Sequence, residues 1–518
     1  MHTIKVYNDY SYLSGYAHPA IVEACTLIQH YWYKRKYLLK DTADYKYHIN
    51  NYKSDFRLKR LIEAAEADKK QYAIPLRKSV KYKNSENIIV INYPDQKKKL
   101  YFNPKDNSFP TGWLFSKVVS VLKERNITYK IEDCRDAIAP LPLNAVFPFE
   151  LRDYQIEAYQ RVINKERGIL DLPTGSGKSA IAAKILSHYG LPALYIVPSL
   201  NLIYQTAEVF SNILGKEYIG FRGDGKSKDG LIVVATQQTL WSRKDTKDIT
   251  DLFNTAKILI LDEAHKVEKT KAQSRTLGNT WYQIAMKCCN ARIRVAMTAT
   301  PGKDFGRHLL EAVTGREIYK LQTSDLIKQD FLSKPTVYIY NIEIKSKIKN
   351  WQTAYKINIF NNKERNRAIV KHAKRLAKKN MSVLIVVDRI ERHGQVLMEM
   401  LGDIAESLYG TDKSDIRLDV LQRFREGELK ILLSTLIKEG VDLPEMDAII
   451  LANAGKGGVG GRKTVQTIGR CLRLTEKKNT AIIIDFFDDD GGVLAKHSEE
   501  RMKVYKSEPE FEIVRGEI

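Results

Sequence analysis

The sequence predicts an α/β protein in which two parallel-sheet lobes follow a small α+β N-terminal domain. Short apolar segments alternate with amphipathic helical segments after residue 151, a pattern typical of parallel sheets covered on both faces. The apolar segments form two clusters, four before residue 300 and four after residue 380. A chain of 518 residues is also too long for a single hydrophobic core, so we expect several domains.

The charge of the chain indicates an acidic partner. A net charge of +22 and a pI near 9.4 favour nucleic acid or an anionic membrane surface. No apolar run approaches the roughly 18 residues that a membrane-spanning helix needs, and the first residues lack the regions of a signal peptide. The five cysteines show no Cys-x-x-Cys spacing, which disfavours zinc and a disulfide framework. We therefore expect a soluble cytoplasmic protein that binds no membrane.

Residues 1–148 form the expected N-terminal domain. They contain 25 Lys and Arg against 15 Asp and Glu, and three closely spaced prolines mark the end of the region. The helical spacing of Ile21, Cys25, Ile28 and Trp32 predicts a helix. The β-rich segments NIIVINY and KLYF predict a hairpin that turns at PDQKK, and TGWLFSKVVSVLKERN predicts a second helix.

One segment of this domain, HYWYKRKYLLK, mixes aromatic and basic residues. Four aromatic residues surround three consecutive cations, and this mixture suits stacking on bases and contact with phosphates. An amphipathic helix that buries its aromatic residues explains the same pattern equally well. The sequence leaves both interpretations open.

LDLPTGSGKSAIAAKIL is the strongest local pattern in the chain. Backbone N–H groups of a glycine-containing loop can surround phosphate oxygens, and a helix that begins after the loop adds a favourable dipole. Lys178 supplies a positive charge for the outer phosphates, and the hydroxyl of Ser179 suits Mg²⁺. The full P-loop pattern has a glycine where this chain has Leu172, but the remaining residues predict a nucleotide-phosphate site. The predicted loop comprises Thr174, Gly175, Ser176 and Gly177.

ILILDEAH supplies two carboxylates to the same site. An apolar strand ends in Asp262 and Glu263, which places both at the carboxyl edge of the sheet, where ligands of such folds bind. Asp262 fits the acid that holds Mg²⁺, and Glu263 is the candidate to orient and deprotonate the attacking water. Two acids at a strand end are usually a helix cap. Their position about 85 residues after the phosphate loop favours the catalytic interpretation instead.

The order of these motifs resembles that of superfamily 2 helicases and translocases over residues 149–487. The resemblance implies RecA-like lobes that bind ATP in the cleft between them. In LRDYQ it implies that Gln155 contacts adenine and that Arg152 assists it. It also implies that His265 of DEAH links the nucleotide site to the rest of the motor, and that Thr298 and Thr300 of TAT couple hydrolysis to movement of DNA.

The same resemblance implies further contacts in both lobes. In the first lobe, contacts with the nucleic-acid backbone are implied for Pro198, Ser199, Thr236 and Gln237. In the second lobe, VLIVVDRIERHGQVL supplies Asp388 and Arg389. STLIKEGVDLPE supplies a hydroxyl for the same backbone, from either Thr435 or Ser434, and places Gly440 and Asp442 near the nucleotide.

QTIGRCLR lies nearly 300 residues after the phosphate loop. Helical spacing puts Gln466 and Arg470 on one face, with Arg473 near Arg470. Taken alone, this is the pattern of a solvated helix face. The resemblance implies instead that Arg470 and Arg473 reach across from the second lobe and neutralise charge on the γ-phosphate, while Gln466 positions the water or the phosphate. The sequence leaves open which arginine lies closer.

A narrower resemblance covers residues from roughly 95 to 135. SFPTGWLFSKVVSVLKERNITYKIED, followed by LRDYQ, is similar to the end of the N-terminal domain in UvsW-like phage helicases, which remodel branched DNA. It implies that the N-terminal domain binds duplex DNA, and that the compartment is a host cytoplasm if the chain comes from a phage. Residues 1–90 match no pattern of that family.

Two other segments carry weaker patterns. AGKGGVGGRK, at residues 454–463, resembles a phosphate loop but lacks the strand before it and the helix after it, so we expect a mobile loop of the second lobe. The acids of DFFDDDGG follow a predicted strand, and we expect a solvated turn there rather than a metal cluster.

Together these patterns predict an ATP-dependent DNA helicase or translocase that acts on branched DNA in replication, recombination or repair. The expected cofactors are ATP and Mg²⁺, and a monomer is favoured. The expected domains are residues 1–148, which bind duplex DNA, residues 149–325, the ATP-binding lobe, and residues 326–518, the second lobe. An RNA helicase and a restriction-type translocase remain as alternatives, and a nucleic-acid clamp gated by ATP without processive unwinding is an alternative of another class.

Overall fold

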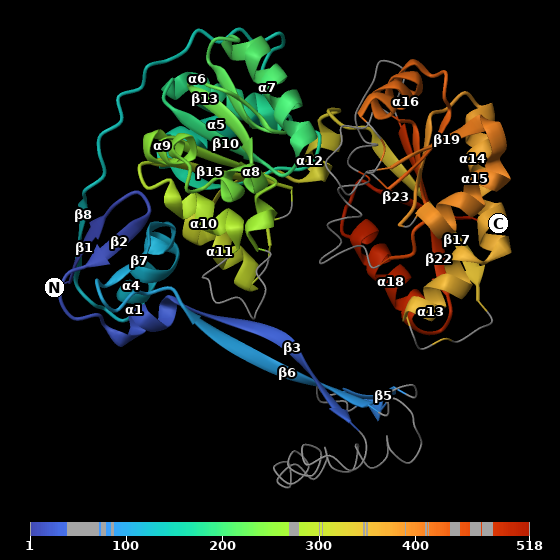
Figure 1. Ribbon diagram of the computed structural model, residues 1–518, viewed down its shortest axis with the longest axis horizontal. Coiled ribbons are helices and arrows are strands. Elements are labelled where there is room, and N and C mark those ends of the chain that lie inside the picture. The colour runs from blue at the N-terminus through green and yellow to red at the C-terminus, as the bar shows by residue number, and fades with distance from the viewer. Residues whose placement is uncertain are drawn as a thin grey trace.

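A computed structural model gives the arrangement of the chain (Figure 1). Four β-sheets organise the part of the chain that it describes. The described residues are 2–38, 72–73, 79–83, 88–268, 279–299, 301–302, 304–344, 348, 351–388, 390–409, 412, 414–435, 446–455, 468 and 480–516.

The N-terminal domain contains a four-stranded sheet with the strand order β7-β2-β1-β8. β1 pairs antiparallel with β2 and parallel with β8, which returns to the sheet after the helices. The helix predicted from TGWLFSKVVSVLKERN is confirmed as consecutive 3-10, π and α turns over residues 111–124. The elements are β1 (His2–Val6), β2 (Tyr10–Leu13), α1 (Pro19–Ala24), β7 (Ser108–Pro110), η1 (Thr111–Trp113), η2 (Leu114–Val118), α4 (Val119–Glu124) and β8 (Tyr129–Asp133).

A long two-stranded arm extends from this domain (Figure 1). β3 (Thr26–Leu38) and β6 (Ile88–Leu100) pair antiparallel over all 13 positions, and β5 (Ser79–Lys83) and β4 (Tyr72–Ala73) continue the sheet beside β6. The helix predicted from Ile21 to Trp32 is therefore wrong beyond α1, and the helical interpretation of HYWYKRKYLLK is wrong for its residues in β3. The hairpin predicted at PDQKK is also wrong, because those residues lie inside β6. Pairing with a strand far away in sequence outweighs the local helical spacing.

The first lobe is an eight-stranded, mostly parallel sheet with the order β12-β11-β13-β10-β14-β15-β9-β16. The four strands predicted before residue 300 are confirmed as β10, β13, β14 and β15, which are almost entirely buried. The strands are β9 (Arg167–Asp171), β10 (Ala193–Val197), β11 (Ile219–Gly223), β12 (Lys226–Lys228), β13 (Ile232–Thr236), β14 (Ile258–Asp262), β15 (Ile293–Thr298) and β16 (Glu317–Lys320). The helices are α5 (Asp153–Lys165), α6 (Lys178–Tyr189), α7 (Leu200–Leu214), α8 (Gln237–Ser242), α9 (Lys247–Thr255), η3 (Ala264–Glu268), α10 (Thr280–Lys287) and α11 (Asp304–Thr314).

The N-terminal domain and the first lobe share one hydrophobic core. Trp113 is fully buried and donates its indole N–H to the carbonyl oxygen of His308 in α11, at 2.7 Å. Gly112 approaches α11 so closely that an added Cβ would lie 2.0 Å from the carbonyl oxygen of Glu311. The guanidinium of Arg167, where β9 begins, donates to the carbonyl oxygen of Asn8 at 2.9 Å. The arm is thus attached to a domain that packs directly on the first lobe.

The second lobe is a seven-stranded parallel sheet with the order β19-β20-β18-β21-β22-β17-β23. The four strands predicted after residue 380 are confirmed as β18, β20, β21 and β22, so the predicted fold class is confirmed in both lobes. Its strands are β17 (Lys334–Glu343), β18 (Val383–Val386), β19 (Ala405–Leu408), β20 (Ile431–Ser434), β21 (Ala448–Leu451), β22 (Thr480–Asp489) and β23 (Glu512–Gly516). α12 (Thr323–Lys328) connects the lobes, and the helices of the second lobe are α13 (Trp351–Tyr355), η4 (Lys356–Phe360), α14 (Lys363–Lys378), η5 (Ile390–Gly394), α15 (Gln395–Leu401), η6 (Gly402–Ile404), α16 (Ser414–Glu426) and α18 (Val493–Lys506). Within the described ranges, no helix has both the length and the apolarity needed to cross a bilayer.

Candidate active site

The predicted phosphate loop connects β9 to α6 at the carboxyl edge of the first sheet. Gly175 and Gly177 have φ angles of +87° and +74°, a backbone conformation that residues with a side chain rarely adopt. Lys178 is the first residue of α6, and its Nζ lies 3.4 Å from the carbonyl oxygen of Pro173 and 3.5 Å from that of Leu172. The ammonium group therefore lies over the loop. A phosphate oxygen would be a stronger acceptor for it than either neutral carbonyl.

The LRDYQ segment packs against this loop. The hydroxyl of Tyr154 and the amide of Gln155 both donate to the carbonyl oxygen of Ser176, each at 3.0 Å. The other end of the Gln155 amide accepts the backbone N–H of Arg152 at 3.0 Å. Gln155 is only 5% exposed, so both ends of its amide have partners inside the protein, and its contact with adenine stays a prediction. The sequence did not indicate Tyr154 as part of the site.

The predicted acids lie close to the phosphate loop. Within the sheet, β15 is the only strand between β14, which ends at Asp262, and β9. Burial and the neighbouring Glu263 carboxylate raise the pKa of Asp262 to about 6, and the ammonium of Lys178 opposes this shift. Glu263 has a φ of +48°, a left-handed conformation that costs free energy for a residue with a side chain. Lys178 is therefore close enough to affect the pKa of Asp262, although the two residues lie far apart in the sequence.

His265 connects these acids to the end of β15. Its Nδ1 lies 3.2 Å from Oε2 of Glu263 and 3.3 Å from the hydroxyl of Thr298. The carbonyl oxygen of Thr298 accepts the backbone N–H of Leu172, just before the phosphate loop, at 2.9 Å. A series of contacts thus runs from Glu263 to the base of the loop. The coupling role of Thr298 stays a prediction, and Thr300 lies outside the described residues.

Ser179 and Asp262 are the residues that would hold Mg²⁺. Ser179 is the second residue of α6 and is half-buried, and Asp262 ends β14. Hydroxyl and carboxylate oxygens are the ligands that this small, hard cation prefers. A bound cation would favour the ionised form of Asp262, which burial disfavours. The donor set therefore fits Mg²⁺.

The predicted nucleic-acid contacts of the first lobe lie at the carboxyl ends of β10 and β13, at the same edge of the sheet. Pro198 and Ser199 are half-buried, immediately before α7. The hydroxyl of Thr236 accepts the backbone N–H of Thr239 as the cap of α8, and the Gln237 amide donates to the hydroxyl of Thr280. Thr236 and Gln237 therefore already have partners within the lobe. The contacts of all four residues with nucleic acid stay predictions, as does that of Thr435, which is half-buried just after β20.

Most residues predicted to act from the second lobe lie outside the described residues, so their roles stay predictions. They are Arg389, Gly440, Asp442, Gln466, Arg470 and Arg473. Two described segments show where the chain enters these regions. Asp388 follows β18 and directly precedes Arg389, and residues 452–455 follow β21 and precede QTIGRCLR.

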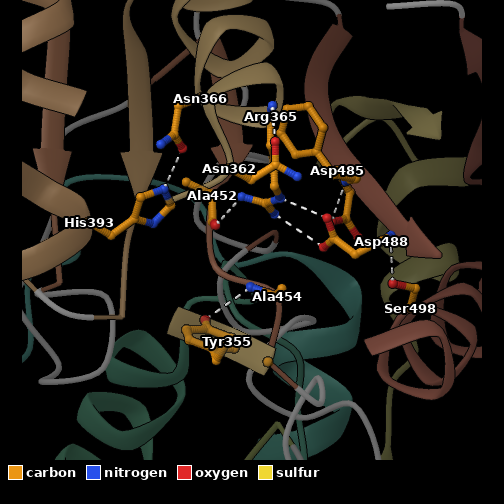
Figure 2. A network of polar contacts seen from close by, with 12 residues as sticks. Tyr355, Asn362, Arg365, Asn366, His393, Ala452, Ala454, Asp485, Asp488 and Ser498 are labelled. Atoms are coloured by element: carbon orange, nitrogen blue, oxygen red, sulfur yellow. Dashed lines mark hydrogen bonds and ion pairs between the residues drawn. The ribbon is translucent and has the colours of Figure 1, made fainter. Parts of the chain in front are cut away.

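A buried polar network in the second lobe was not predicted from the sequence (Figure 2). Arg365 pairs with Asp488 at 2.7 Å, and Arg501 pairs with Asp485 at 2.8 Å. Asp490 accepts backbone N–H groups at the start of α18. These three acids are at most 2% exposed, so the solvated turn predicted for DFFDDDGG is wrong. Arginines far away in the sequence neutralise two of the acids, and no local pattern could link them.

Comparisons with known proteins agree with this arrangement of motifs. Residues 148–303 match the family described as type III restriction enzyme, res subunit, and residues 361–475 match the helicase conserved C-terminal domain. The chain is 29% identical to the DNA 3'-5' translocase XPB2 of Sulfurisphaera tokodaii over 378 residues, which are 65% of this chain and 81% of that protein. It is 25% identical to the ATP-dependent DNA helicase uvsW of Enterobacteria phage T4 over 359 residues, which are 65% of this chain and 68% of that protein.

Solved structures support the fold alone. The structure of S. cerevisiae Dbp5 bound to RNA and ADP BeF3 is 19% identical to this chain and superposes with a TM-score of 0.52. The match covers 70% of this chain and 89% of Dbp5.

Proposed function

The chain belongs to the superfamily 2 helicases and is an ATP-dependent helicase, and on this premise we propose that it unwinds or branch-migrates branched DNA such as forks and junctions. The observation that carries the proposal is the position of the basic arm. The arm belongs to a domain that shares its core with the ATP-binding lobe, so a duplex bound to the arm would have a fixed place relative to the motor.

The arm has the chemistry and shape expected of a duplex-binding element. β3 and β6 contain six Lys and Arg, at positions 34–36 and 97–99, and only one acid, Asp95. Lys99 is 5% exposed and its ammonium lies over the ring of Phe305, so the proposal rests on the other five cations. Thirteen paired residues reach about 44 Å at the usual rise of a strand, and Figure 1 shows this ribbon extending away from the lobes. The arm has two strands where it leaves the domain, and β5 and β4 widen it at residues 88–92 of β6. A β-ribbon can enter the major groove of duplex DNA, and lysines and arginines neutralise its phosphates. We therefore assign duplex binding to residues 1–148, with residues 149–325 and 326–518 as the two motor lobes.

In the proposed reaction, the phosphate loop and Lys178 bind the phosphates of ATP, and Glu263 accepts a proton from the attacking water. Mg²⁺, held by Ser179 and Asp262, would neutralise negative charge on the phosphates. His265 lies between Glu263 and Thr298 and would relay the state of the nucleotide to the DNA-binding edge. Arg470 and Arg473 would complete the site from the second lobe, which makes hydrolysis depend on closure of the two lobes.

A panel of substrates tests the preference for branched DNA. ATP turnover and strand displacement are measured with four-way junctions, forks, plain DNA duplex and RNA duplex at equal nucleotide concentration. We expect the highest stimulation and displacement with junctions and forks, because only these offer a duplex to the arm and a strand to the lobes together. Equal activity on plain duplex would contradict the branched-DNA proposal, and the highest rate with RNA would identify an RNA helicase.

Charge removal on the arm tests its role in binding duplex DNA. The triple variant K34A/R35A/K36A is expected to bind duplex more weakly and to reduce the slope of log K against log salt concentration by about two to three units, because each phosphate contact contributes about 0.9. K371A/K378A/K379A removes the same charge from exposed positions at α14 and serves as the control. Identical salt slopes for the two variants would exclude the arm as the duplex-binding element.

A further inference from the structure

Three side chains bind the backbone of residues 452–455, directly after β21. Figure 2 shows two of them, Arg365 at Ala452 and Tyr355 at Ala454. Arg365 donates to the carbonyl oxygen of Ala452 at 2.7 Å, and Arg501 donates to that of Gly455 at 3.0 Å. Between them, the backbone N–H of Ala454 donates to the hydroxyl oxygen of Tyr355 at 3.1 Å. This short segment, which has no secondary structure of its own, is therefore held at three of its four residues.

Tyr355 differs from the two arginines in the strand to which it connects residues 452–455. Arg365 and Arg501 are anchored by Asp488 and Asp485, both on β22. The hydroxyl of Tyr355 instead donates at 2.6 Å to Oδ2 of Asp388, two residues after the end of β18. Tyr355 is 6% exposed, and burial raises its pKa well above the ordinary value, so that the hydroxyl stays protonated and able to donate. One hydroxyl thus joins the loops that follow two adjacent parallel strands.

A backbone hydrogen bond also joins the segment after β21 to the last residue of β18. The N–H of Asn453 donates to the carbonyl oxygen of Val386 at 3.1 Å, and an added Cβ on Gly455 would lie 3.6 Å from Oδ2 of Asp388. A displacement of Asp388 would therefore reach Ala454 through Tyr355, whose hydrogen bond with the Ala454 backbone is buried. Buried polar groups tolerate the loss of a partner poorly, so the two loops are expected to move together.

We propose that Tyr355 is a positioning residue that couples DNA binding by the second lobe to ATP hydrolysis, through Asp388 on one side and Ala454 on the other. The inference rests on the proposed function, because it takes Arg389, next to Asp388, as a DNA contact and the segment after Gly455 as the path to Arg470 and Arg473. DNA that fixes the loop after β18 would favour one position of residues 452–455 and thereby the hydrolytic arrangement of the arginines.

The variant Tyr355→Phe tests this coupling, since it removes one oxygen and keeps the ring. We expect DNA-independent ATP turnover within about 2-fold of wild type and DNA-stimulated turnover reduced about 5- to 10-fold, the size that single residues in coupling networks contribute. The KM for ATP should stay unchanged, while the DNA concentration that gives half-maximal stimulation rises. A purely structural role would instead lower both activities together.

Ser382→Ala is the matched control. The hydroxyl of Ser382 donates to Oδ2 of Asp447 at 2.9 Å and so joins the residues that directly precede β18 and β21, at the opposite ends of the same two strands. This variant should keep its DNA stimulation. In a double-mutant cycle, Asp388→Ala combined with Tyr355→Phe should reduce stimulation no further than the stronger single variant, because both remove the same link.

The outcomes separate this inference from the proposed function. Full DNA stimulation in Tyr355→Phe, or an equal loss of stimulation in Ser382→Ala, would overturn the inference. Stimulation of the wild type by DNA would leave the helicase assignment intact in either case. A wild-type chain whose turnover does not respond to DNA would overturn both.

Discussion

The variant Lys178→Ala is expected to lose DNA-stimulated ATP hydrolysis by about 10²- to 10³-fold, the effect of removing one preorganised donor from a charged transition state. Lys178 begins α6, and its ammonium lies over the carbonyl oxygens of Leu172 and Pro173. It is also close enough to Asp262 to oppose the rise in the pKa of that acid. It is the described cation best placed to meet the outer phosphates. Steady-state phosphate release with and without DNA measures the loss.

Lys184→Ala is the control for this variant. Lys184 lies in the same helix, with its ammonium over the rings of Phe147 and Tyr159 instead of the phosphate loop. It should keep wild-type turnover. Unchanged turnover in Lys178→Ala would contradict the assignment of the chain as an ATP-driven motor.

The variant Arg473→Ala is expected to bind ATP normally and to hydrolyse it about 10³- to 10⁵-fold more slowly, the contribution of an arginine that stabilises charge on the γ-phosphate in other phosphoryl-transfer enzymes. Binding is measured with a fluorescent ATP analogue and hydrolysis in a single turnover. Binding and hydrolysis should respond differently because binding of ATP needs only the phosphate loop, whereas stabilisation of the transition state needs both lobes.

Arg425→Ala, which changes an exposed arginine of α16 in the same lobe, should leave both quantities unchanged. Comparison of Arg473→Ala with Arg470→Ala shows which arginine lies closer to the phosphate. The variant that lacks the closer arginine should hydrolyse ATP more slowly than the other. Normal hydrolysis in both variants would show that the role of QTIGRCLR across the cleft is wrong.

The fold of the two lobes was predictable because its information is local. Strands such as Ile258–Asp262 are short, apolar and buried on both faces, so the sequence marks each of them without reference to its neighbours. The arm was not predictable in this way. Residues 26–38 pair with residues 88–100, and no sequence pattern in either segment indicates its pairing partner. The helical spacing around Ile28 therefore misled the prediction.

In the candidate site too, features that depend on neighbouring residues were predictable and features that depend on packing were not. The phosphate loop is recognisable in the sequence because phosphate binding requires particular residues at neighbouring positions, here Gly175, Gly177 and Lys178. The contacts that support the loop, such as Tyr154 to the carbonyl oxygen of Ser176, depend on how α5 packs against it. The pairing of Arg365 with Asp488 joins residues 123 positions apart and has no signature in the sequence. Roles that rest on one motif can be predicted, and roles that rest on packing require the structure.

Strand separation on a forked DNA with a fluorophore and a quencher at the fork tests the central claim most directly. ATP should separate the strands in the wild type, while Glu263→Gln, which retains the nucleotide site but lacks the base, should bind the fork and separate nothing. ATP that changes the affinity for the fork in the wild type without separating the strands would contradict the claim and identify the chain as an ATP-gated clamp.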